Sequence, residues 1–157
     1  MLVEHAMTTA TLCCSLDDTL ETIAYQMWNG DCGAVPVLNE QGMPVGIVTD
    51  RDIAMALALR HASAHQLRAR DLVGARALVS CSPSWELRQA LKLMTKEKIR
   101  RLPVVDDQHH VVGLLSLCDI VEVAGSGRKK SDVSITELVD SLRQIAQSHR
   151  AAAASGA

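Results

Sequence analysis

Apolar residues along this chain fall into short runs whose spacing alternates between that of strands and that of helices. The runs Ala34–Leu38 and Val45–Thr49 are compact and are separated by the turn sequence Asn39-Glu40-Gln41-Gly42, which predicts a β-hairpin. Helical spacing precedes and follows the hairpin, at Leu20, Ile23, Ala24 and Met27 and again at Ile53, Ala54, Met55, Leu57 and Ala58. With a short strand over Ala10–Cys14, the first part of the chain predicts the order β-α-β-β-α.

The same pattern returns 67 residues later. Without a gap, residues 5–53 align with residues 72–120, and twelve of these 49 pairs are identical. The second copy predicts a strand over Ala77–Ser80, a helix opened by Ser82-Pro83-Ser84, a hairpin of Leu102–Val105 and Val111–Ser116, and a helix over Cys118–Ala124. A repeat of this length is one supersecondary unit used twice.

The pattern divides the chain into five parts. We expect a first repeat over residues 1–61, a polar connector over 62–70, a second repeat over 71–125, a flexible basic linker over 126–130 and an amphipathic helix over 131–150. Ser15 is the expected cap of the first helix, with Asp17 and Asp18 in its first turn. The last helix has three possible destinations: this chain, another copy or a partner protein; packing within a homodimer is the favoured one.

Composition narrows the functional class. Aromatic residues are 2% of the 157 residues and the formal net charge is −2, which argues against stacking on single-stranded nucleic acid and against a basic nucleic-acid or membrane surface. Five cysteines without a C-x-x-C spacing indicate reduced, mostly buried thiols. The sequence has no signal-peptide pattern and no apolar run near 18 residues, so we expect a cytoplasmic protein without a transmembrane helix.

The most specific feature is a motif that ends each hairpin. Gly46-Ile47-Val48-Thr49 is followed by Asp52, and Gly113-Leu114-Leu115-Ser116 is followed by Asp119. A strand that ends at a helix start presents free backbone N–H groups and the positive end of the helix dipole, which favours phosphate. An aspartate one turn later can accept two hydrogen bonds from a ribose diol.

Two β-α-β-β-α units that carry this motif resemble a tandem pair of CBS (cystathionine β-synthase) domains, a Bateman module, of the stand-alone bacterial type. The resemblance covers residues 3–124 and implies an α/β (α+β) fold with two lobes related by a pseudo-twofold axis, plus the C-terminal helix. It implies a non-catalytic regulatory module that binds AMP, ADP, ATP or S-adenosylmethionine in clefts between the repeats, requires no cofactor or metal, and forms a homodimer with a possible regulated partner.

The resemblance also implies roles for individual residues. Asp52 and Asp119 match ribose-binding positions, and Thr49, Ser116, Arg51, Arg100 and Arg101 match phosphate- or hydroxyl-binding positions. The expected adenine-packing residues are Ile47, Leu114, Ala10, Ala77, Val35, Pro36, Leu102 and Pro103. Because repeat one has Gly33-Ala34 where repeat two has Arg100-Arg101, the two sites are not expected to be equivalent.

Each of these roles has a simpler alternative. The aspartates and hydroxyls would also serve as helix caps, and the arginine pair would also belong to a solvated basic face with Lys96 and Lys98. His61 and His65 have metal-binding spacing but no further ligand. For the whole chain, the alternatives are a dimerisation module with vestigial clefts and a nucleotide hydrolase, although no general base is evident.

Overall fold

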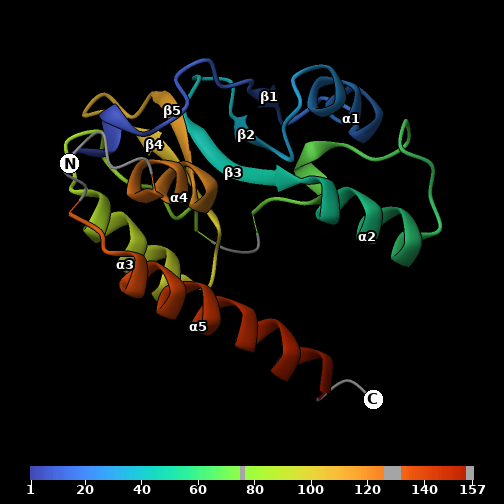
Figure 1. Ribbon diagram of the computed structural model, residues 1–157. Helices are drawn as coiled ribbons and strands as arrows, with labels where there is room; N and C mark the ends of the chain where they lie inside the picture. The colour runs from blue at the N-terminus through green and yellow to red at the C-terminus, as the bar shows by residue number, and fades with distance from the viewer. Residues whose placement is uncertain (75–76, 126–131, 155–157) are drawn as a thin grey trace. The chain divides into compact units, whose positions relative to one another are not determined.

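The computed structural model describes the backbone of residues 1–74, 77–125 and 132–154 (Figure 1). By contact, the chain divides into two units. The first-repeat unit comprises Ala10–Val79 with the hairpin tip Asp107–Val111, and the second-repeat unit comprises Met1–Thr9, Ser80–Asp106 and the chain from Val112 onward. The expected linker, with Arg128, Lys129 and Lys130, lies outside the described residues.

The first-repeat unit is built on a three-stranded sheet in the order β1-β2-β3. Its elements are β1 (Cys14–Ser15), α1 (Leu20–Asn29), β2 (Ala34–Leu38), β3 (Pro44–Thr49), α2 (Asp50–Arg60) and the 3-10 turn η2 (Ala69–Asp71). Strand β1 pairs parallel to β2, and β2 pairs antiparallel to β3. One apolar cluster joins the buried sides of α1, α2 and the sheet, including Leu20, Ile23, Met27, Val35, Val37, Val48 and Ile53.

The turn chemistry explains the β2–β3 hairpin. Asn39 Oδ1 accepts hydrogen bonds from the backbone N–H groups of Gln41 and Met43, at 3.0 and 2.9 Å. Gly42 completes the turn at φ 76°, a conformation that costs glycine little. The hairpin predicted from the sequence is therefore confirmed, with β3 beginning one residue earlier, at Pro44.

The second-repeat unit contains α3 (Leu87–Glu97), β4 (Arg101–Val105), β5 (Val111–Ser116), α4 (Leu117–Gly125), α5 (Ile135–Ala154) and the N-terminal 3-10 turn η1 (Val3–His5). Strands β4 and β5 form its two-stranded sheet. Its buried residues occupy the positions that the internal repeat predicts, among them Leu87, Met94, Leu102, Leu115 and Ile120. The predicted fold class is confirmed.

Several predicted boundaries are wrong. Helix α1 is capped by Thr19 rather than Ser15, because Ser15 closes a separate turn in which its Oγ accepts from Asp17 N. In repeat two, Ser82 forms the same kind of turn with Ser84, and α3 begins after Glu86. The first strands are also displaced, since β1 begins at Cys14 and repeat two has an isolated bridge between Cys81 and Val104 rather than a strand over Ala77–Ser80.

Helix α5 lies along α3 and also contacts α4, within the second-repeat unit (Figure 1). It begins at Ile135 rather than at 131, because Ser134 and Glu137 cap it: Glu137 Oε2 accepts from Ser134 N and Oγ, and Ser134 Oγ accepts from Glu137 N. Leu138 and Ile145 are buried. Of the three destinations open to this helix, the structure shows packing on its own chain.

No helix in the described part of the chain has the length and apolar character needed to cross a membrane.

Candidate functional site

The motif of repeat one forms a reciprocal capping box at the start of α2. Thr49 Oγ1 accepts from Asp52 N at 3.2 Å, while Asp52 Oδ2 accepts from Thr49 N at 2.9 Å and from the Thr49 hydroxyl at 2.7 Å. Both side chains are therefore positioned by the helix terminus itself. The capping role that the sequence left as an alternative is real, and a ligand role would have to be added to it.

Repeat two reproduces this geometry at the start of α4. Asp119 Oδ2 accepts from Ser116 N and Ser116 Oγ, both at 2.7 Å, and Ser116 Oγ accepts from Asp119 N at 3.2 Å. Two copies of one motif thus give the same local arrangement on two units. Sequence alone predicts both capping boxes, because the hydroxyl residue and the acid keep a spacing of three.

Each capping box has remaining hydrogen-bonding capacity. The described bonds to Asp52 and Asp119 all use Oδ2, which leaves the Oδ1 of each carboxylate available as a further acceptor. The first-turn backbone N–H groups and the helix dipole add positive potential beside it. This combination can accept hydrogen bonds from a diol and attract an anionic group at the same place.

The β2–β3 hairpin places several predicted residues on one face. Ile47 pairs with Pro36 and Thr49 pairs with Ala34, so these residues share the same side of the pleated sheet. Val35 lies on the opposite side with Val37 and Val48, and it is 0% exposed within the core. The structure therefore brings Ile47, Pro36 and Thr49 together but directs Val35 into the unit's interior.

In the second-repeat unit, alternate residues of the strands again face either the candidate site or the core. Leu114 and Ser116 are half-buried, whereas Gly113 and Leu115, on the other face of β5, are buried. Pro103 is buried, and Leu102 is 0% exposed with Val104 on the core side of β4. Leu102 corresponds to Val35 in this respect.

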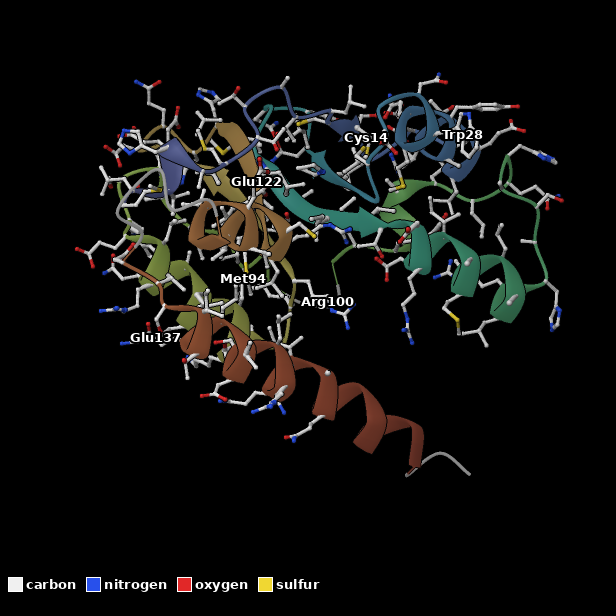
Figure 2. The ribbon with its side chains drawn as sticks, in the orientation of Figure 1. Cys14, Trp28, Met94, Arg100, Glu122 and Glu137 are labelled. Atoms are coloured by element: carbon white, nitrogen blue, oxygen red, sulfur yellow. The ribbon has the colours of Figure 1, made fainter. Side chains whose placement is uncertain are left out.

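The predicted basic residues occupy different surroundings. Arg100 is exposed, and its carbonyl oxygen accepts from Leu117 N at 3.0 Å, which fixes it beside the Ser116–Asp119 capping box (Figure 2). Arg101 is half-buried at the start of β4, and Arg51 is exposed in the first turn of α2. In repeat one, the position equivalent to Arg100 is Gly33, whose carbonyl accepts from Asp50 N at 3.4 Å.

The first residues of each repeat make contacts that the sequence pattern does not predict. Thr8 forms an antiparallel bridge with Leu114, with N···O distances of 3.0 and 2.9 Å. Met7 and Thr8 lie so close to Gly113 that a Cβ there would come within 2.6 Å of Met7 Sδ, and Val73 lies equally close to Gly46. The glycine in each motif, Gly46 or Gly113, was the feature of the sequence that could have indicated such a close approach. Ala10 and Ala77, predicted to pack on adenine, are exposed and lie outside any strand.

The cysteines fit a structural role. Burial raises the pKa of both Cys14 and Cys81 to about 12, so these two repeat-related thiols stay neutral at physiological pH. Cys118, in the first turn of α4, is exposed. Among the described residues, no three His, Cys, Asp or Glu side chains are grouped as metal ligands would be.

Comparison with known proteins identifies the repeats. The family model for the CBS domain matches twice, at residues 3–59 and 69–126. CBS domain-containing protein YhcV of Bacillus subtilis is 36% identical over 118 residues, which are 75% of this chain and 81% of YhcV. Uncharacterized protein MK0525 of Methanopyrus kandleri is 33% identical over 106 residues, 68% of this chain. The chain spans 54% of MK0525, about half its length.

Solved structures show the same fold. The CBS domain pair of protein MJ0100, in complex with 5′-methylthioadenosine and S-adenosyl-L-methionine, has a TM-score of 0.73 and 24% identity, covering 82% of this chain and 98% of that one. CBS domain protein PAE2072 from Pyrobaculum aerophilum, complexed with AMP, has a TM-score of 0.69 and 20% identity, covering 76% and 89%. Two family matches on two units with two capping boxes lead to one conclusion: the chain belongs to the CBS domain family and carries a tandem pair of CBS domains.

Proposed function

We propose that this protein is a non-catalytic regulatory module that binds an adenosine-containing ligand, such as AMP, ADP, ATP or S-adenosylmethionine, and signals by changing conformation. The observation that carries the proposal is the duplicated capping box, in which both aspartates keep an acceptor oxygen beside a helix N-terminus. Its support from relatives is that MJ0100 and PAE2072 were solved with adenosyl ligands.

Each part of such a ligand has a candidate contact. Oδ1 of Asp52 or Asp119 would accept hydrogen bonds from the ribose hydroxyls, and the helix N-terminus with Thr49 or Ser116 would face the phosphate. Ile47 and Leu114 offer aliphatic surface to adenine, together with Pro36 and Pro103. Aliphatic packing suits a chain in which aromatic residues are 2% of the total.

Arg100 supplies the fixed positive charge of the second site. Its backbone is tied to the first turn of α4, so its guanidinium starts from the helix terminus at which an anionic group would be attracted. Arg101 and Arg51 are further candidates for phosphate contact. The first site has Gly33 in place of Arg100, so the second should favour phosphate-bearing ligands more strongly.

The same proposal extends to the state of the protein in the cell. We propose a cytoplasmic homodimer that acts on a regulated partner protein and has no catalysis of its own. Ligand would stabilise one conformation over another in proportion to its differential affinity for the two, and the partner would recognise the favoured surface.

The test is calorimetric titration of AMP, ADP, ATP and S-adenosylmethionine into wild type, Asp52→Asn, Asp119→Asn and the double variant. Asparagine keeps an acceptor for the capping box but removes the carboxylate charge, so each substitution should weaken binding at its own site about tenfold, which is about 1.4 kcal/mol. Asp50→Asn is the matched control, because Asp50 also starts α2 but accepts from Arg51 N and takes no part in the box.

Unchanged affinity and stoichiometry in the double variant would rule out the ribose role. Thermal melts provide a second readout, since a ligand at a hundred times its dissociation constant adds about 2.7 kcal/mol of apparent stability. If no ligand of the panel shifts the melt, the dimerisation module with vestigial clefts becomes the better hypothesis; turnover would instead indicate a hydrolase.

A further inference from the structure

Helix α3 of the second-repeat unit carries basic side chains along its exposed side. Arg88, Lys92 and Lys96 follow one another at spacings of four, which places them in line along the helix, and Lys98 comes directly after its end. We call the three exposed lysines of this line the basic row. Residues 86–101 hold six basic and two acidic side chains, a formal net charge of +4, whereas the rest of the chain carries −6.

The contacts within the chain use the first cation of this line but not the basic row. Arg88 Nε lies 3.1 Å from Glu137 Oε1 and so helps to hold α5. Within the described part of the chain, Lys92 and Lys98 form no salt bridge. Lys96 Nζ lies 3.6 Å from the carboxylate of the next residue, but its side chain is 79% exposed. Since like charges at a spacing of four destabilise a helix, the row does not serve the stability of α3.

The internal repeat shows that the fold does not require these lysines. Their counterparts 67 residues earlier are Tyr25, Asn29 and Asp31. The helix dipole favours a cation near a helix C-terminus, yet the left-handed residue after the helix is Lys98 in repeat two, at φ 58°, and Asp31 in repeat one, at φ 46°. Because the same unit folds with a tyrosine, an amide and an acid at these places, the row has a purpose other than folding.

We propose that the basic row is a docking surface for a short acidic segment of a partner protein. This inference rests on the regulated partner of the proposed function and specifies the chemistry that the partner presents. From Lys92 to Lys98 the row rises about 9 Å along the helix axis, at 1.5 Å per residue. Acidic side chains at alternate residues of an extended segment, about 6–7 Å apart, can face successive lysines of such a row.

Two features favour an acidic protein segment over nucleic acid. Residues 86–101 contain no aromatic side chain on which a base could stack. Duplex DNA carries a negative charge about every 1.7 Å of its axis, and so extended a polyanion would also meet the rest of this chain, whose formal net charge is −6. A short segment can stay on the row, because salt screens exposed charges beyond about 8 Å at physiological ionic strength.

The test measures binding of a short, fluorescently labelled oligoglutamate peptide to the full chain by anisotropy, at low and at physiological salt. Lys92→Gln with Lys96→Gln should weaken binding about tenfold, because two exposed ion pairs are lost. Arg60→Gln with Arg143→Gln is the matched control: it gives the same net charge but removes exposed arginines of α2 and α5, outside the row, and should bind like wild type. Dichroism should show that the lysine variant melts no lower than wild type.

Three outcomes would overturn the proposal: no binding of the peptide to wild type at low salt, equal weakening in the control, or tighter binding of an oligothymidylate of similar charge, which would indicate nucleic acid. Calorimetric titration of AMP separates this proposal from the previous one, because the row contains no residue of the capping boxes. Asp119→Asn should weaken AMP binding and leave the peptide unaffected. Loss of peptide binding with unchanged AMP binding in the lysine variant supports the docking surface whether or not the ligand assignment holds.

Discussion

The two motif glycines show how closely a single residue can be constrained by packing. A Cβ added at Gly46 would come within 2.5 Å of Val73 Cγ1 and 2.8 Å of its Cβ. At Gly113 it would meet Met7 Sδ at 2.6 Å and the carbonyl oxygen of Thr8 at 2.9 Å. In each unit, the first residues of one repeat lie on the motif strand of the other repeat, and the absent glycine side chain permits that approach.

Because side-chain atoms alone lie close to Gly46 but a backbone oxygen lies close to Gly113, we expect a second substitution to restore stability more fully at Gly46. Gly46→Ala should destabilise the protein by about 1–3 kcal/mol through overpacking, and Val73→Gly should relieve the overlap because it removes both close atoms, Cγ1 and Cβ. Met7→Ala should recover less of the stability lost in Gly113→Ala, because the Thr8 carbonyl oxygen stays in place. Denaturant unfolding of the single and double variants measures both coupling energies. Equal rescue at the two glycines would contradict this account.

At the scale of elements, the sequence predicts hairpins well and helix starts poorly. Both hairpins have clear turn residues between apolar runs, and both were placed within one residue. The helix starts were misplaced because Ser15 and Ser82 have the composition of caps but close local turns. Thr19, the actual cap of α1, is held extended by a bridge to Arg68, a contact between residues far apart in the sequence.

Helix α5 is held at its start by a charged contact that should depend on pH. Hydrogen bonds from the backbone and hydroxyl of Ser134, with the charge of Arg88 nearby, hold the pKa of Glu137 below its ordinary range. A carboxylate with a lowered pKa contributes stability above its unfolded pKa, about 4.3, and loses that contribution as the pH falls through the folded value. The attachment of α5 should therefore be complete at neutral pH and weaken in acid.

Glu137→Gln tests this dependence. Glutamine can still accept from Ser134, but it has no charge for Arg88, so the variant should melt below wild type at pH 7. The gap should narrow as the pH falls through the folded pKa of Glu137, because wild type then also becomes neutral at this position. Asp140→Asn is the control on the same helix, because Asp140 contacts Arg143 within α5 at 3.5 Å and not α3. A gap that stays constant with pH would show that charge at Glu137 does not hold the helix.

For the whole molecule, the duplicated pattern predicts the fold class and both capping boxes, because hydroxyl-to-acid spacing is local. It does not predict which unit the first nine residues join. They pack with repeat two through the Thr8–Leu114 bridge, a pairing between segments that no periodicity connects. Nor does it predict that Val35 and Leu102, in apolar strands, face the cores rather than the candidate sites.

The two candidate sites differ most at one pair of equivalent positions, Gly33 and Arg100. Their carbonyl oxygens make equivalent contacts to the first turns of α2 and α4, so replacing Arg100 by glycine removes a charged side chain from a backbone arrangement that repeat one already tolerates. Arg100→Gly should therefore leave the fold intact. The guanidinium is expected to contact phosphate, which makes its loss specific to phosphate-bearing ligands.

Titration of AMP and of 5′-methylthioadenosine, which lacks phosphate, separates charge from shape. Arg100→Gly should weaken AMP binding at the second site about tenfold, the equivalent of about 1.4 kcal/mol for a charge-assisted contact, and leave 5′-methylthioadenosine unaffected. Lys96→Ala, on the exposed surface of α3, is the control for a general change in basicity. Equal weakening of both ligands would mean that Arg100 shapes the site, and no weakening of either would assign it to the solvated basic surface.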